Sequence, residues 1–230
     1  MTLPFGVIDF FAVFARYNVA VWPAPLLLTT VAVVAVGVAL RARPWSDRVV
    51  AGVLGLLWLW MGVVYHWTFF RAINPAATVF AGSFVLEGGA LVVWGAMRHT
   101  LRFRARPSVQ GLVGALLVVF ALGVYPLLGY AAGHRYPATP TFGLPCPTTI
   151  YTLGLLLWAE RPSRWLLAVP LAWSVLGASA ALQLGVLEDF GLVVAGILAG
   201  LLTWRPQTGV PLFPRSRGAG TGRAPRAAES

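Results

Sequence analysis

Long apolar runs separated by short polar segments predict a chain of membrane-spanning helices. A helix needs about 20 mainly apolar residues to cross a bilayer. We expect spans at about residues 25–40, 49–70, 76–97, 109–131, 147–159, 165–184 and 190–204. A shorter apolar segment at about residues 5–17 precedes Pro23 and Pro25, and we expect it to form a helix at the membrane interface. The predicted fold class is therefore all-α, a polytopic transmembrane bundle of about seven spans.

Composition supports one integral membrane domain over residues 1–204. Of the 230 residues, 58% are hydrophobic and only 10% are charged, which lies outside the range of soluble domains. Residues 205–230 are rich in Arg, Pro and Gly and have no apolar face, so we expect a disordered basic tail. The formal charge of +10 comes from arginines between apolar runs rather than along one polar face. The lipid bilayer is thus the expected partner, and nucleic acid is not.

The arginines also predict the orientation of the chain. With seven spans, all of the 17 basic residues fall on one side except Arg16, Arg71 and Arg135. Cytoplasmic loops carry the excess of positive charge, so the N-terminus is expected outside and the C-terminus in the cytoplasm. The chain has many Arg, Ala, Gly and Pro residues and no Lys, which suggests a bacterial protein of the inner (cytoplasmic) membrane.

The segment 133–149 holds the most unusual chemistry on the predicted outer side. It contains His134, the single cysteine and prolines that prevent regular structure before Pro147. A span of about 13 residues from Pro147 covers only about 20 Å, which is less than the hydrocarbon core. The preceding loop should therefore dip into an outward-facing pocket, since irregular backbone at that depth must be buried or line a wet cavity. Cys146 is expected at the N-cap of this helix.

Polar residues near this loop are the candidate ligand-binding residues. Beside Glu87, the candidates are Tyr65, Arg71, Asn74, Arg135, Tyr136, Thr148 and Thr149. In this hypothesis Arg71 or Arg135 attracts negative charge. Glu87 is predicted near the middle of the membrane, where an ionisable residue indicates function by default. The alternative is a protonated carboxyl that bonds to neighbouring helices, with Gly88 and Gly89 allowing close packing.

A metal or haem site is a second hypothesis. His66, His134 and Cys146 could supply three ligands for copper, zinc or haem iron. No HxxxH, CxxC or CxxCH spacing is present, and nothing in the sequence requires a cofactor. The alternative is that Cys146 is a small buried residue and that the histidines form ordinary hydrogen bonds or stack on rings.

Other motifs point away from known enzymes. The chain has no GxSxG and no Walker loop, and without Lys it cannot form a retinal Schiff base. The sequence therefore gives no support for an enzyme. Gly196 and Gly200 form a GxxxG pair, which indicates close helix packing within the bundle or a homodimer contact.

Three runs resemble a bacterial family of multi-pass membrane proteins catalogued as a domain of unknown function. They are residues 16–23, residues 65–77 and the stretch from Gly133 to Thr149. The resemblance covers about residues 5–202 and implies one integral membrane domain without an established activity. The expected function is binding or passage of a small solute or ion through the outward-facing pocket. The alternatives are a membrane-embedded metal or haem redox protein and an accessory subunit of a larger membrane complex.

Overall fold

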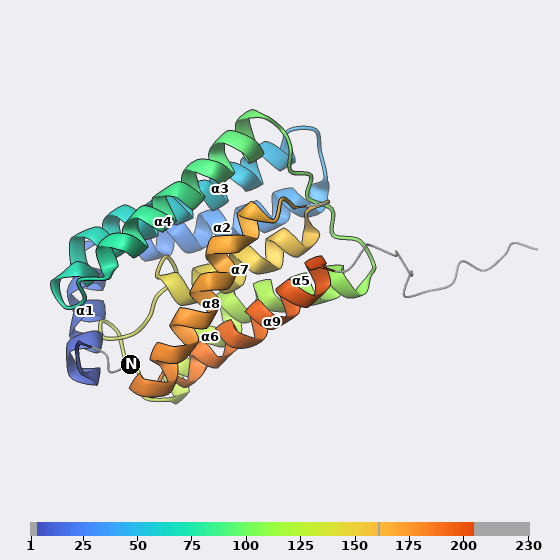
Figure 1. Ribbon diagram of the computed structural model, residues 1–230. Coiled ribbons are helices and arrows are strands. Elements are labelled where there is room, and N and C mark those ends of the chain that lie inside the picture. The colour runs from blue at the N-terminus through green and yellow to red at the C-terminus, as the bar shows by residue number, and fades with distance from the viewer. Residues whose placement is uncertain (1–3, 161, 205–230) are drawn as a thin grey trace, which may run out of the picture.

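The computed structural model describes residues 4–160 and 162–204, which form an all-helical bundle without strands (Figure 1). The α-helices are α1 (Val7–Ala20), α2 (Ala24–Arg41), α3 (Ser46–Trp60), α4 (Ala77–Ala90), α5 (Val109–Val119), α6 (Tyr125–Ala131), α7 (Pro145–Trp158), α8 (Trp165–Leu184) and α9 (Phe190–Trp204). Helices α3, α4 and α5 continue into π-helical segments η1 (Met61–Phe69), η3 (Leu91–Met97) and η4 (Phe120–Val124). Two short 3₁₀ segments are η2 (Phe70–Ala72) and η5 (Leu187–Asp189). The predicted tail, residues 205–230, lies outside the described residues.

Five continuous helical segments of the described chain are long and apolar enough to cross a membrane. They are Ala24–Arg41, Ser46–Ala72, Ala77–Met97, Val109–Ala131 and Trp165–Leu184. Helices α7 and α9 have 14 and 15 residues and fall below the length of a full span. The helices are consistent with an integral membrane protein. The count of seven spans and the orientation stay predictions.

Helix α7 begins two residues earlier than its sequence suggested. Pro145 opens the helix and Leu144 is the N-cap, with Pro147 still in the first turn. Proline suits these positions because its missing N–H would have no intrahelical partner there. The prediction that Cys146 caps the helix was therefore wrong, since this residue lies inside the first turn.

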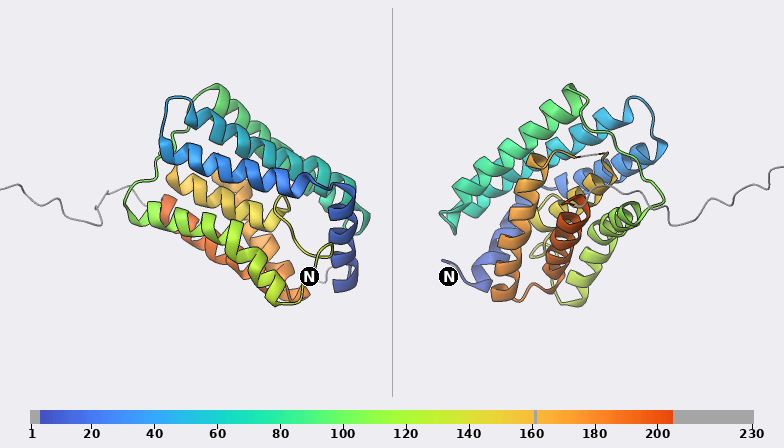
Figure 2. Two further views of the ribbon diagram at one scale, coloured as in Figure 1. Left: turned by 180° about the vertical axis from the view of Figure 1, so that it is seen from behind. Right: turned by 45° about the vertical axis from the view of Figure 1, so that its right-hand side comes forward.

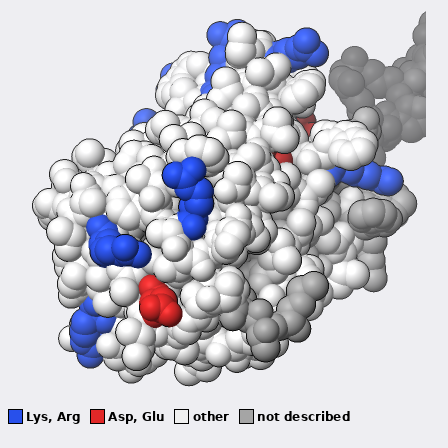
Figure 3. Space-filling view, turned by 60° about the vertical axis from the view of Figure 1, so that its left-hand side comes forward, with Lys and Arg blue, Asp and Glu red and all other residues white. Residues whose placement is uncertain are grey.

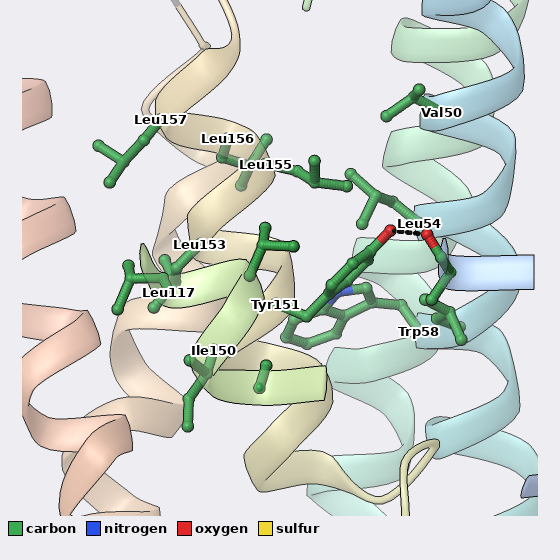
Figure 4. Packing of buried hydrophobic residues seen from close by; sticks show 14 of the residues in the cluster. Val50, Leu54, Trp58, Leu117, Ile150, Tyr151, Leu153, Leu155, Leu156 and Leu157 are labelled. Atoms are coloured by element: carbon green, nitrogen blue, oxygen red, sulfur yellow. Dashed lines mark hydrogen bonds between the residues drawn. The ribbon is translucent and has the colours of Figure 1, made fainter. Parts of the chain in front are cut away.

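Helix α7 is the centre of the bundle. Every residue from Pro147 to Trp158 is buried, as expected for a helix that is apolar on all faces. Helices α5, α8 and α9 pack on one side, and α2 and α3 reach it from the other (Figures 1 and 2). The Trp58 indole N–H donates to Thr152 Oγ1 at 3.0 Å. The Tyr151 hydroxyl donates to the carbonyl of Ala32 at 2.9 Å, which is the dashed line in Figure 4.

Glycines bring α3 and α4 into backbone contact. A Cβ placed on Gly88 would lie 2.8 Å from the Leu59 nitrogen and 2.9 Å from the Gly55 carbonyl oxygen. A Cβ on Gly89 would have no atom within 4 Å. Only Gly88 of this adjacent pair therefore allows the close approach that the sequence suggested for both.

The GxxxG pair of α9 has an equally uneven environment. A Cβ on Gly196 would lie 2.6 Å from Ser174 Cβ, so this glycine packs α9 against α8. A Cβ on Gly200 would have only Leu171 as a neighbour, at 3.9 Å. Gly196 thus serves packing within the bundle, and a homodimer contact stays a prediction.

Three arginine-containing loops meet at one end of the bundle. Asp47 accepts hydrogen bonds from the Phe103 N–H at 2.8 Å and from Arg104 Nη1 at 2.9 Å. The Arg104 N–H donates to the carbonyl of Trp158 at 2.7 Å, and Arg106 forms an ion pair with Glu160. The described parts of the loops that follow α2, η3 and α7 therefore share one end, as the topology prediction requires. Away from the ends charge is sparse, and the face drawn in Figure 3 is mostly uncharged.

Candidate functional site

The other end of the bundle is organised by the buried side chain of Asn18 at the end of α1. Its amide donates to the carbonyls of Pro137 and Thr139 at 2.7 and 2.8 Å. Its Oδ1 accepts from the Thr141 hydroxyl at 2.7 Å, and its backbone carbonyl accepts from the Tyr136 hydroxyl at 3.2 Å. Helix α1 lies across this end of the bundle (Figure 1). Asn18 therefore fixes the irregular loop between α6 and α7 against helix α1.

Beneath this loop lies a cavity of about 280 Å³. Its wall is mainly apolar, and aromatic side chains from α1, η1, η2, α4 and α8, including Phe14, Phe80 and Trp173, form part of it. Polar atoms are few, and three of the residues that bring them are Tyr125, Cys146 and Asp189. Small-molecule sites have this composition, a largely apolar surface with a few placed polar groups.

Asp189 is the most unusual of these polar residues. It is 4% exposed and accepts a hydrogen bond from the Tyr125 hydroxyl at 2.5 Å. It lies in η5, outside the five long apolar segments. Burial raises the pKa of its carboxyl to about 7, and the negative charge of Glu188 adds to this effect. The hydrogen bonds from Tyr125 and Cys146 and the positive charge of His134 lower that pKa in part.

Glu188, the neighbour of Asp189, has a different partner. Its Oε1 lies 2.7 Å from His134 Nδ1, and its side chain is fully buried. The ring of His134 also lies 4.6 Å from the ring of Phe11 in α1. His134 thus joins the loop to η5 and pairs with one of the two adjacent carboxyls.

The structure gathers part of the predicted ligand-binding set at the cavity. Tyr65 and Asn74 line it. Arg71 instead lies over the Trp67 ring, with its guanidinium carbon 4.2 Å from the ring centroid. Arg135 lies over the Tyr130 ring at 3.6 Å. Neither arginine lines the cavity, so the structure gives no support for anion attraction there.

Three further predicted ligand-binding residues, Tyr136, Thr148 and Thr149, lie in the loop or at the start of α7 and do not line the cavity. Tyr136 reaches Asn18, as described above, and its ring packs edge-on against Trp22. The Thr148 hydroxyl accepts from the Gly143 N–H at 3.0 Å and so supports the start of α7. Thr149 is fully buried and its hydroxyl has no hydrogen-bond partner among the described residues.

Glu87 and His66 are buried in the bundle, and neither makes a side-chain hydrogen bond to another described residue. Glu87 is 3% exposed, and its Oε1 makes no hydrogen bond within the described chain. Both ring nitrogens of His66 also lack partners. The His66 ring lies edge-on to Phe80, Phe84 and Trp173, at centroid distances of 5.7, 4.6 and 5.1 Å. His66 therefore lies behind the aromatic wall of the cavity.

The three proposed metal ligands have separate surroundings. His66 is enclosed by rings, His134 pairs with Glu188, and Cys146 faces Asp189. Residues 4–160 and 162–204 contain no group of three or more His, Cys, Asp or Glu side chains that could hold a metal ion. The metal and haem hypothesis stays a prediction to which the described geometry adds no support.

Sequence reasoning did not assign Asp189, Tyr125 or Trp173 to the site. A signal was available for Asp189, because two adjacent acids directly precede the short apolar run 190–204. An ionisable pair next to a membrane segment is a functional hypothesis in its own right. Tyr125 and Trp173 lie within apolar runs that also predict ordinary core residues, so only packing could identify them.

We expect Asp189 to make the folded protein less stable as the pH rises. Its pKa is about 7 in the folded state against an ordinary value of 3.8, so the folded state holds the proton more tightly. The contribution of Asp189 to the free energy of unfolding is complete below about pH 4 and is lost as the pH rises through about 7. The total loss is on the order of 4 kcal/mol at most. Unfolding of the detergent-solubilised protein should therefore occur at a lower temperature at pH 8 than at pH 5.

The variant Asp189→Asn isolates this contribution. Asparagine keeps the shape and can still accept from Tyr125, but it does not titrate. The facing groups Glu188, His134, Tyr125 and Cys146 remain in both proteins, so the difference between the two pH profiles reports Asp189 together with its coupling to them. An identical pH dependence of unfolding in the two proteins would show that Asp189 does not hold its proton near neutral pH.

The described fold and site define a class of protein, a helical bundle with membrane-length apolar segments and an aromatic cavity at one end. The chain belongs to a family of unknown function, DUF6064, whose match covers residues 7–209. No curated protein and no solved structure shows significant similarity to the chain. The family supplies no activity, so any function has to be argued from the site.

Proposed function

We propose that this protein is a bacterial inner-membrane protein that binds a small, mainly apolar solute in the cavity at its outer end. The seven predicted spans, with the N-terminus outside, place the loop 133–144 and the cavity on the outer side. The observation that supports binding is the cavity itself, a space of about 280 Å³ with a largely apolar, partly aromatic wall and a few polar groups, among them those of Asp189, Tyr125 and Cys146.

The exposed surface supports a lipid environment for the bundle. Large apolar side chains are exposed along several helices, among them Leu27 and Val34 in α2, Leu86 in α4 and Leu116 in α5. In water such a surface would favour aggregation, whereas lipid chains cover it. The basic loops at the opposite end then face the cytoplasm.

The single cysteine provides a direct test of accessibility. Cys146 lines the cavity and is the only thiol of the chain. We expect a small membrane-impermeant maleimide to label it in right-side-out vesicles but not in inverted vesicles. The control is Thr100→Cys in a Cys146→Ser background, since Thr100 is exposed at the basic end and should be labelled only in inverted vesicles. Labelling of Cys146 from the inverted side alone would overturn the orientation.

Binding is tested by protection of the same thiol. With 2-phenylethanol as probe at about ten times its dissociation constant, alkylation of Cys146 by N-ethylmaleimide should slow about tenfold. Ala180 lines the cavity, and Ala180→Phe should abolish this protection by filling the space. The matched control is Ala172→Phe, at an exposed position of the same helix that does not line the cavity. Absence of protection by any small apolar probe would count against a binding cavity.

A further inference from the structure

The cavity places an uncompensated acid against an aromatic wall. Asp189 accepts from the neutral Tyr125 hydroxyl and faces the thiol of Cys146. The nearby imidazole of His134 is engaged by Glu188. Among the described residues that line the cavity there is no Arg and no His. The negative charge of Asp189 therefore has no cationic partner within the cavity.

The aromatic wall suits a positively charged group. Rings contributed by α1, η1, η2 and α4 line the space, with Tyr65 and Phe70 stacked at a centroid distance of 5.5 Å. The faces of aromatic rings attract organic cations, most strongly where water is excluded. An anion would instead meet the carboxyl of Asp189, and a neutral solute would leave the ionised form of Asp189 unpaired.

Trp173 provides an independent indication of a missing ligand atom. It lines the cavity and is 9% exposed, and its buried indole N–H makes no hydrogen bond of good geometry among the described residues, with only the thiol of Cys146, a weak acceptor, facing it. A point at the Cβ position of Gly177, another lining residue, lies 3.5 Å from Trp173 Nε1 and 3.8 Å from Cys146 Sγ. This donor thus lies at the same part of the cavity as Cys146. Buried donors are normally paired, so this position calls for an acceptor.

We propose that the solute is a hydrophobic amine, bound as a cation, that also carries a hydrogen-bond acceptor. Its ammonium group lies beside Asp189, its apolar body lies on the aromatic wall, and its acceptor receives the Trp173 N–H. This inference rests on the proposed function, because it requires that the cavity binds a solute. It narrows the expected solute from any small apolar molecule to one chemical class.

Three probes with one phenylalkyl frame test the charge. They are phenethylamine, 2-phenylethanol and 3-phenylpropionate, which are cationic, neutral and anionic at pH 8. Protection of Cys146 from alkylation in the purified full-length protein reports binding of each. We expect phenethylamine to protect at a concentration about tenfold or more below that of 2-phenylethanol, as for a hydrogen bond to a charged group, and 3-phenylpropionate to give no protection.

The outcomes separate the two proposals. Equal or better protection by 2-phenylethanol or 3-phenylpropionate would overturn the proposal that the solute is an amine, but not the proposal that the cavity binds a solute. Protection by none of the three, with Cys146 still reactive, would overturn the proposed function as well. Asp189→Asn should remove the preference for the amine, whereas Glu160→Gln, an acid at the opposite end, should keep it. Thermal stabilisation by each probe gives a second readout that does not depend on thiol reactivity.

The acceptor is tested separately at Trp173. The probe 2-amino-1-phenylethanol adds one hydroxyl to phenethylamine, and it should bind severalfold more tightly to the wild-type protein, as one paired hydrogen bond allows. Trp173→Phe keeps an aromatic wall and removes the N–H, so the two amines should then bind equally. An unchanged ratio in Trp173→Phe would overturn the role of the indole N–H.

Discussion

Replacing Gly88 with alanine should destabilise the protein, whereas the same replacement at Gly89 should not. A methyl group on Gly88 would meet backbone atoms of Leu59 and Gly55 in α3 at 2.8 and 2.9 Å. Backbone cannot move aside as a side-chain end can, so the two helices have to separate. Overpacking of this kind costs about 1–3 kcal/mol and sometimes more. We expect the Gly88→Ala protein to unfold at a clearly lower temperature.

The neighbouring residue, Gly89, is a matched control, because alanine there is not expected to destabilise the protein. A methyl group on Gly89 has open space around it. Alanine stabilises a helix interior by about 0.8–1 kcal/mol relative to glycine, so Gly89→Ala should be neutral or slightly stabilising. The unfolding temperature of each variant can be measured in detergent, as the temperature at which the monodisperse peak in size-exclusion chromatography is lost. Equal stability of the two would mean that α3 and α4 are not packed through Gly88.

Asn18→Ala should release the loop that covers the cavity. The change removes three side-chain hydrogen bonds, to Pro137, Thr139 and Thr141, and leaves the freed groups of the loop without their partner. At about 1 kcal/mol for each bond, the loss is on the order of 3 kcal/mol. Because the loop leads into the start of α7, we also expect Cys146 to be alkylated faster.

Asn74→Ala provides the comparison for Asn18. Asn74 is also buried at this end and lines the cavity, but within residues 4–160 and 162–204 the one side-chain hydrogen bond that it makes is from the Ala76 N–H of its own turn to its Oδ1. The expected loss is about 1 kcal/mol, with little change in the alkylation rate of Cys146. If the two variants had the same stability and the same thiol reactivity, Asn18 would not hold the loop.

Packing explains why the three runs that carry the family resemblance are far apart in the sequence. Asn18 of the first run binds the loop of the third run, and Trp22 packs against Tyr136. Tyr17 meets Tyr65 of the second run edge-on, at a centroid distance of 5.6 Å. The runs therefore form one structural unit at the end of the bundle that holds the cavity.

The sequence by itself determined the helical class, because long apolar runs have few other stable arrangements in lipid. It also determined the gathering of basic loops at one end, since this depends only on the order of the helices. The importance of the segment 133–149 was evident from its prolines and its single cysteine. The start of α7 was missed by two residues because Pro145 and Pro147 both fit a first turn.

The tertiary structure alone decided which polar residues meet. Arg71 and Arg135 carry the chemistry of an anion site, yet each stacks on a nearby ring and leaves the cavity to Asp189. Gly88 and Gly89 are the same residue type at adjacent positions of α4, but only Gly88 faces α3. Sequence spacing gives the face of a single helix, whereas the partner of that face depends on how all the helices pack. For this reason the fold class was predictable, and the cavity with its acid was not.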